Sequence, residues 1–145
     1  MANKIDLDRN PVAIEFHRRL RWADTDATGR LHFPRIFEII EEAECELLRK
    51  VNWQVNLRET KYEFPRVHVE CSFHRMIFLD APFSLRLTVG KIGNTSIRYD
   101  FRVLDVEGEL AIEGSMTVAV LESGRLVRIP SSLRDALAIS SSLKS

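Results

Sequence analysis

The chain has 145 residues, of which 45% are hydrophobic and 29% are charged, and its 21 Lys and Arg residues balance its 21 Asp and Glu residues. This length and composition are typical of one globular domain with its own core. A net charge of zero argues against a nucleic-acid-binding protein, which normally carries a basic excess, and it does not oppose self-association.

The N-terminal residues and the cysteines indicate the compartment. The first ten residues carry Asp and Asn before any apolar run, unlike a secretory signal peptide, and no apolar stretch has the length of a membrane span. Cys45 and Cys71 are too few for a disulfide framework, although a single bridge between them stays open. We therefore expect a cytoplasmic protein with no membrane span and no nucleic-acid partner.

The first half of the chain predicts a strand, a loop and a helix. Residues 12–22 mix apolar and basic residues with partial alternation, which predicts a strand, and the loop WADTDATG follows at residues 22–29. Over residues 33–50 apolar residues recur at helical spacing, with acids in the early turns and basic residues in the last, as the helix dipole favours. Pro34 suits the first helical turn, because backbone N–H groups there have no partner within the helix and proline has no N–H.

The second half predicts a sheet. Residues 51–62 predict a loop with a short helical turn, and after Pro65 the hydrophobic period changes to two. In the first run, Val67, Val69, Cys71 and Phe73 are expected on one face. Short turns join the next three runs, so these predict an antiparallel meander with one apolar face. The alternating runs are residues 66–74, 83–89, 97–103 and 110–120.

These elements predict the α+β class. The one long helix has to bury its isoleucine stripe, and the sheet has to cover its apolar face, so the sheet is expected to wrap around the helix. Residues 131–145 are expected to form a tail with a short helix and a frayed end.

The loop contains two aspartates that could carry chemistry. A turn aspartate that binds local backbone is the simplest role for either Asp24 or Asp26. A carboxylate can also act as a nucleophile or a general base. The start of the predicted helix follows soon after, and helix N-termini offer unpaired N–H groups and favour negative charge. Spacing alone leaves both roles open.

With the segments RLRWADTDATGRLHFPRIFEIIEEAECELL and SFHRMIFLDAPFSLRLTVGKIGNTSIRYDF, the sequence resembles the hotdog-fold thioesterases of the 4-hydroxybenzoyl-CoA thioesterase type, including the short acyl-CoA thioesterases. The first segment matches a strand, a D-x-D-x-x-G loop and a central helix in that order. The resemblance implies a single hotdog domain over residues 1–145, with its core at about 12–130, in which an antiparallel sheet wraps around the central helix.

The resemblance also implies an activity and a set of site residues. It implies an acyl-CoA thioesterase in which Asp26 is the nucleophile or general base, and the backbone N–H of Phe33, seven residues further on, is the oxyanion donor. Asp24 is then a structural companion. Glu41 lies where the founding member uses an acid to contact the ring hydroxyl of its substrate, with a solvated helix face as the competing interpretation. The implied substrate contacts are His32, Glu41, Val67, His68 and Val69, the last three beside the pantetheine arm of coenzyme A (CoA).

Some expectations remain open at this point. The segment GKIGNTS lacks the arginine pair that holds the coenzyme's phosphates in the founding member, so the acyl group and the nucleotide contacts are not implied. No two histidines stand at metal-ligand spacing with a carboxylate, so neither a metal nor a cofactor is expected beyond the CoA of the substrate. The alternatives are a hotdog dehydratase and a non-catalytic acyl-CoA or acyl-carrier binding module. Pairing between copies would cover exposed strand edges, and the resemblance implies assemblies in which two sheets join, so a homodimer or homotetramer with active sites between subunits is expected.

Overall fold

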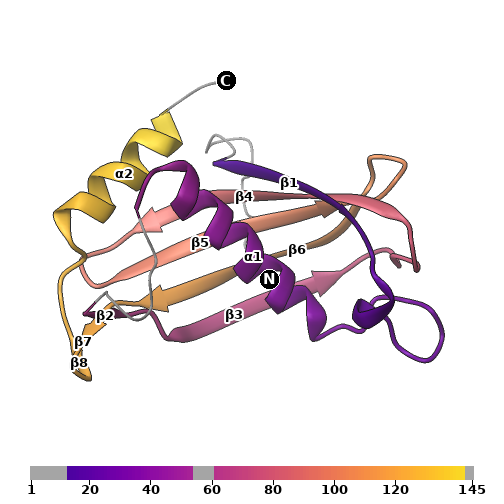
Figure 1. Cartoon of the computed structure of the whole chain (residues 1–145), viewed down its shortest axis with the longest axis horizontal. Coiled ribbons are helices and arrows are strands. Elements are labelled where there is room, and N and C mark those ends of the chain that lie inside the picture. Colours follow the sequence, from indigo (N-terminus) through magenta and orange to yellow (C-terminus); the bar gives the residue numbers. More distant parts are fainter. Residues whose placement is uncertain (1–12, 54–60, 143–145) are drawn as a thin grey trace.

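A computed structural model describes residues 13–53 and 61–142 and places one long helix across an antiparallel sheet (Figure 1). The predicted succession of a strand, a helix and four strands is confirmed, and so are the antiparallel meander and the α+β class. The sheet has the order β1-β4-β5-β6-β3, and every neighbouring pair is antiparallel. Its strands are β1 (Ile14–Arg19), β3 (Arg66–Phe73), β4 (Pro82–Ile92), β5 (Ser96–Leu104) and β6 (Leu110–Ala119).

Helix α1 (Arg35–Lys50) buries its apolar stripe against the sheet. It begins two residues later than the predicted start at Phe33, and Pro34 precedes the helix instead of lying in its first turn. The reason is a tight turn closed by i→i+3 hydrogen bonds, in which the Arg35 N–H donates to His32 O (2.9 Å) and the Ile36 N–H to Phe33 O (3.3 Å). The buried apolar residues of α1 are Ile36, Ile39, Ile40, Ala43, Leu47 and Leu48.

The face of the meander that covers α1 is apolar throughout its centre. Full burial of such side chains stabilises the fold by about 1.5–3 kcal/mol each. This burial holds α1 against the sheet. The buried side chains of this face include Leu85 and Leu87 from β4, Ile97, Tyr99, Phe101 and Val103 from β5, and Ile112, Met116 and Val118 from β6.

Strand β3 forms an edge of the sheet and departs from its predicted alternation. A register shift between Arg66 and His68 interrupts the face that Val67 was expected to share with Val69, because a bulge adds one residue there. Arg66 therefore reaches α1, where its Nη2 lies 2.7 Å from Oε1 of the buried Glu44. Three apolar side chains of β3 remain exposed, namely Val67, Val69 and Phe73.

Gly114 of β6 explains how closely β3 can pack. A Cβ atom there would lie 1.9 Å from Glu70 O on β3 and 2.7 Å from the Phe101 ring. A glycine inside a strand often marks such a close backbone approach. Any larger residue would push the edge strand away from the sheet.

A second, small sheet and helix α2 complete the fold. A small sheet has the order β2-β7-β8, with β2 (Tyr62–Glu63), β7 (Leu121–Glu122) and β8 (Arg125–Leu126). The loop predicted for residues 51–62 is wrong at Tyr62, which pairs with Glu122, and residues 54–60 lie outside the described residues. Helix α2 (Ser131–Ser142) buries Leu133 and Leu137 in the core. Within residues 13–53 and 61–142, no helix has the length and hydropathy needed to cross a membrane.

Candidate active site

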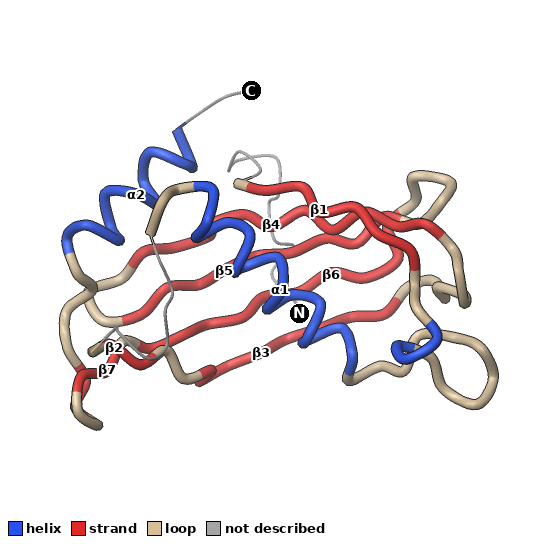
Figure 2. Tube along the Cα trace, viewed as in Figure 1, coloured by secondary structure: helices blue, strands red, loops and turns tan. Residues whose placement is uncertain are grey.

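The loop between β1 and α1 lies at one end of the sheet and folds back on itself like a hairpin (Figure 2). It begins with a single 3₁₀ turn, η1 (Trp22–Asp24), that the predicted strand over residues 12–22 did not foresee. The His32 N–H donates to Asp24 O at 2.8 Å and closes the base, and the Asp26 N–H donates to Arg30 O at 2.8 Å nearer the tip. Gly29 has φ +75°, which glycine adopts without steric cost. The loop therefore holds Asp26 at a defined place.

A neighbouring segment braces this loop. The Leu31 N–H donates to Ile77 O at 2.9 Å, and the Leu79 N–H donates to Gly29 O at 2.9 Å. Residues 77–79 belong to the connection from β3 to β4, which Figure 2 shows at the same end of the sheet. The two loops are thus joined by backbone hydrogen bonds into one rim.

The carboxylate of Asp26 is held by one oxygen only. Its Oδ1 accepts the Thr28 hydroxyl at 2.6 Å, the Thr28 N–H at 2.8 Å and the Arg30 N–H at 3.4 Å. Within the described residues, no donor binds Oδ2. The Thr28 hydroxyl and N–H are the main reason that the pKa of Asp26 lies below its ordinary value, so this exposed carboxylate is ionised at neutral pH.

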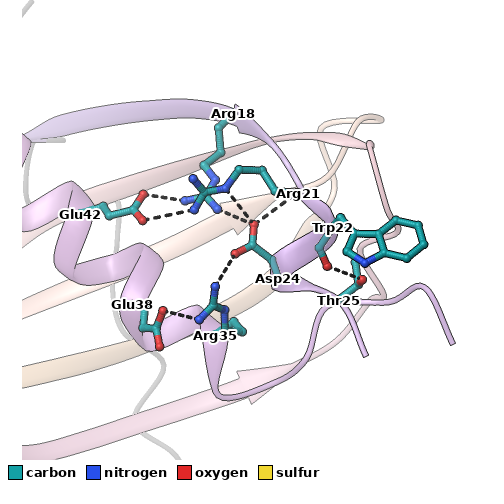
Figure 3. Close-up of polar contacts among 8 residues, drawn as sticks. All are labelled: Arg18, Arg21, Trp22, Asp24, Thr25, Arg35, Glu38 and Glu42. Carbon is teal, nitrogen blue, oxygen red and sulfur yellow. Dashed lines mark hydrogen bonds and ion pairs between the residues drawn. The ribbon is translucent and has the colours of Figure 1, made fainter. Parts of the chain in front are cut away.

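Asp24 has the opposite environment, buried in an ionic network (Figure 3). Its Oδ2 accepts the Arg18 Nη2 at 2.5 Å and the Arg21 N–H at 3.0 Å, and its Oδ1 lies 3.5 Å from the Arg35 Nη2. Burial alone raises the pKa of Asp24, but the Arg21 N–H and the Arg18 guanidinium outweigh it and hold the pKa below its ordinary value. Asp24 therefore serves the structure of the loop.

The same network ties the loop to α1. Arg18 Nη1 donates to Glu42 Oε2 at 2.5 Å, and Arg35 Nη1 lies 2.7 Å from Glu38 Oε2 (Figure 3). With Arg21 and Asp24, three cations face three anions from β1, the 3₁₀ turn and the helix. Because the charges balance, the network fixes these three elements relative to one another without adding a net charge beside Asp26.

Phe33 presents an unpaired N–H close to the helix start. Within the described residues the Phe33 N–H donates no hydrogen bond, and Phe33 is 62% exposed. Its ring packs edge to face against Phe73 of β3, with centroids 6.4 Å apart, and the His32 ring lies beside it at 5.9 Å. A free N–H at this place is available to a ligand and has the helix dipole behind it.

A cleft of about 520 Å³ opens beside Asp26. Its lining combines apolar side chains with a few polar and charged ones, which is the usual character of a small-molecule site. Arg30 at the rim lies over the Phe78 ring, 5.7 Å from its centroid, and Arg75 is paired with Asp105 at 2.8 Å. The lining residues are Asp26, Thr28, Arg30, Leu31, Phe73, His74, Arg75, Met76, Ile77 and Ile112.

The other residues expected at the site lie elsewhere on the chain. Glu41 is on the exposed side of α1, with its Oε1 3.6 Å from Arg66 Nε. Residues 67–69 are on the β3 edge, where His68 Nε2 lies 3.0 Å from Glu70 Oε1. None of these residues, nor His32 or Phe33, lines the cleft beside Asp26. Within one chain, Asp26 and the predicted substrate residues on α1 and β3 are not brought together.

Sequence reasoning missed most of the cleft. Thr28 lies inside the D-x-D-x-x-G motif, so its proximity to Asp26 was a usable signal. Arg30 follows the motif directly and had the same signal, whereas His74 and Arg75 had none, because the β3–β4 connection reaches the loop only through long-range pairing. Within the described residues, no group of three or more His, Cys, Asp or Glu side chains is gathered to hold a metal ion.

The fold agrees with a family match. A model of the thioesterase-like superfamily matches residues 20–137, so the chain belongs to the thioesterase-like superfamily. The match includes the loop, α1 and the whole meander. The resemblance to hotdog thioesterases inferred from the sequence is therefore confirmed, together with the hotdog fold of a sheet around a central helix.

Individual relatives are distant in sequence and close in structure. The chain is 29% identical over 99 residues to the 1,4-dihydroxy-2-naphthoyl-CoA hydrolase of Nostoc punctiforme, a match that covers 66% of this chain and 67% of that protein. The structure of a hypothetical protein from Aquifex aeolicus has a TM-score of 0.81 and 22% identity, over 86% of this chain and 98% of that one. A 1,4-dihydroxy-2-naphthoyl-CoA thioesterase from Synechocystis has a TM-score of 0.80 and 16% identity, over 86% and 94%.

Proposed function

We propose that the protein is a cytoplasmic acyl-CoA thioesterase that hydrolyses a CoA thioester to the free carboxylic acid and CoA, with Asp26 as the catalytic carboxylate. The observation that carries the proposal is the asymmetry of Asp26, an ionised carboxylate in a cleft with Oδ1 fixed and Oδ2 free. Membership of the thioesterase-like superfamily supports the reaction class. The two free thiols, Cys45 and Cys71, fit a reducing compartment.

Two routes use the same atoms. In the covalent route, Asp26 Oδ2 attacks the thioester carbonyl carbon, the C–S bond breaks, the CoA thiolate leaves and takes a proton, and water hydrolyses the resulting anhydride. In the other route, Oδ2 takes a proton from water, the hydroxide attacks the carbonyl, and the proton goes to the departing thiolate. Both routes need an ionised Asp26, which the Thr28 hydrogen bonds favour.

The Phe33 N–H is the proposed oxyanion donor. Negative charge develops on the thioester oxygen in either route, and a pre-aligned N–H stabilises that charge more than it stabilises the neutral substrate. The Phe33 N–H is free, lies next to the start of α1, and is joined to Asp26 through a loop closed by the His32 N–H bond to Asp24 O. The loop thus carries both the proposed reacting carboxylate and the proposed donor.

We also propose that the enzyme is a homodimer, or a tetramer of such dimers, joined at the free edge of β3. An exposed strand edge with apolar side chains is a template for pairing with a second copy. Val67, Val69 and Phe73 lie exposed along this edge, and Phe33 packs against Phe73. Glu41 and residues 67–69 lie outside the cleft of their own chain, so in this proposal they reach the substrate, with His32, at the junction of two chains.

An aromatic acyl group is the proposed substrate class. Two relatives are named for a hydroxylated aromatic CoA ester. The exposed rings of Phe33 and Phe73 provide faces and edges on which a planar acyl group can stack.

Release of free CoA thiol from a panel of short-chain, long-chain and aromatic CoA esters tests the proposal. We expect thiol release, fastest with an aromatic ester such as 1,4-dihydroxy-2-naphthoyl-CoA. A dehydratase would change the acyl chain and leave the thioester intact, and a binding module would retain the ester without releasing thiol. Either of those outcomes across the whole panel would overturn the proposed function.

A further inference from the structure

We propose that Thr28 is the positioning residue of the reacting carboxylate, because it anchors Oδ1 of Asp26 and thereby presents Oδ2 to the thioester or to water. This inference rests on the proposed function of Asp26 and goes beyond it by assigning the two carboxylate oxygens different roles.

The geometry around Oδ1 carries the inference. All three donors that reach Asp26 within the described residues end on the same oxygen, and two of them, the hydroxyl at 2.6 Å and the N–H at 2.8 Å, come from Thr28. Rotation of the carboxylate about its Cβ–Cγ bond would break all three hydrogen bonds together. The free oxygen is therefore held in one orientation, which is what a near-attack geometry requires.

The Thr28 hydroxyl is also the one side-chain donor to Asp26 within the described residues. The other charged or titratable groups facing this carboxylate are His32, near the start of α1, and Arg30, His74 and Arg75, which share its cleft. Arg75 is paired with Asp105 and Glu107, His74 lies 3.2 Å from Glu113, and the Arg30 side chain stacks on Phe78. Orientation of Asp26 therefore depends on Thr28 and on loop backbone.

The same loop supplies a matched control. Thr25 is one residue before Asp26, and its hydroxyl donates to Trp22 O at 2.8 Å and not to the Asp26 carboxylate (Figure 3). Removing this hydroxyl deletes one hydrogen bond of similar length from the same loop without touching Asp26. Thr25→Val thus measures how the loss of one hydrogen bond within the loop affects activity when the hydrogen bonds of Asp26 are left in place.

Kinetics of Thr28→Val, Thr28→Ser and Thr25→Val test the role. Valine keeps the shape of threonine and removes the hydroxyl, so we expect kcat to fall about 10-fold in Thr28→Val, the size of one lost charge-assisted hydrogen bond, with KM unchanged. The acidic limb of its kcat/KM profile should move to higher pH, because the donor that favours the ionised form is gone. Thr28→Ser should restore both values, and Thr25→Val should match wild type. An unchanged kcat in Thr28→Val would overturn the positioning role.

A measurement without turnover separates this inference from the proposed function. Carboxyl ¹³C NMR of Asp26 should show titration at higher pH in Thr28→Val than in wild type or Thr28→Ser, whether or not a CoA ester is hydrolysed. Identical titration in all three proteins would refute the role of the Thr28 hydroxyl. If wild type hydrolyses esters and Asp26→Asn does not, while Thr28→Val behaves as wild type, the inference alone fails.

Discussion

Asp24 and Asp26 are two residues apart, yet their carboxylates have opposite surroundings. Asp24 is 1% exposed and surrounded by three arginines, whereas Asp26 is exposed and bound through one oxygen. The charge of Asp24 is fully engaged with Arg18, Arg21 and Arg35, so it has no free oxygen to offer a substrate. Asp24 therefore stabilises the loop, and Asp26 is the carboxylate proposed to react.

Asp24→Asn should destabilise the protein without acting on the chemical step. The change removes one partner from a buried ion pair with Arg18, and such losses cost on the order of 3 kcal/mol. We expect a fall in melting temperature of about 10 °C, measured by calorimetry. The control is Asp80→Asn, because Asp80 and Arg19 form an exposed pair at 4.0 Å that contributes little. Equal melting temperatures for both variants would contradict the network's role.

Acid should weaken this contribution in a defined direction. The folded-state pKa of Asp24 is lowered from 3.8, so its stabilisation is fully present above that value and is lost as pH falls below it through the folded pKa. Urea unfolding at pH 7 and pH 3 should thus show a smaller gap between wild type and Asp24→Asn at pH 3. A gap that stays constant or widens on acidification would show that folding does not lower the pKa of Asp24.

At the scale of elements, the loop between β1 and α1 is held at its base and turned by a glycine near its tip. Gly29 has φ +75°, and its N–H donates to Asp26 O at 3.1 Å. The loop is short enough that a change at this turn moves Asp26 relative to Phe33. Backbone geometry at Gly29 is therefore a direct test of whether the loop arranges the site.

Gly29→Ala should lower activity more than its cost in stability explains. A Cβ at Gly29 meets no atom within 4 Å, so the cost is the backbone strain of a positive φ, about 1 kcal/mol. Gly124, with φ +74° in the turn between β7 and β8, has equally open space and serves as the control. We expect both alanine variants to lose similar stability, and only Gly29→Ala to lose about 10-fold or more in kcat. Equal kcat values would show that the turn does not position Asp26.

Local patterns predicted the elements around the site better than its boundaries. The stripe at Ile36, Ile39 and Ile40 was sufficient to predict α1, because a helix shows its packing face in its own sequence. The late start of α1 was not visible in the sequence, since the hydrogen bonds to His32 O and Phe33 O depend on the conformation of the loop that precedes the helix. The arginine network was also hidden, because Arg18 and Glu42 meet only when β1 lies beside the helix.

At the scale of the whole molecule, the free edge of β3 determines the proposed assembly. Val69→Lys should shift the dimer toward monomer in sedimentation velocity, because a charge would have to be buried where two edges pair. Val106→Lys is the control, since Val106 is an exposed valine in the turn between β5 and β6. We expect Val106→Lys to sediment as wild type does. A wild-type monomer with full activity would contradict a site built between chains.

The features of the sheet that the sequence pattern did not predict depend on contacts between residues far apart in the chain. The meander from β4 to β6 was visible because short turns join strands with clear alternation. The bulge at Val67 and the pairing of Tyr62 with Glu122 were not, since each depends on a partner far along the chain. The cleft is likewise assembled from Asp26 on one loop and His74 and Arg75 on another. Its composition could not be read from either segment alone.

Turnover of a CoA ester by Asp26→Asn is the measurement that tests the central claim most directly. Asparagine keeps the size of the side chain but removes the charge needed to attack the thioester or to deprotonate water. We predict that kcat falls by about 100-fold or more, in line with the usual contribution of a catalytic base, while calorimetry shows that the ester still binds. If Asp26→Asn hydrolyses every ester as fast as wild type, while a folded Asp24→Asn does not, Asp26 is not the catalytic carboxylate.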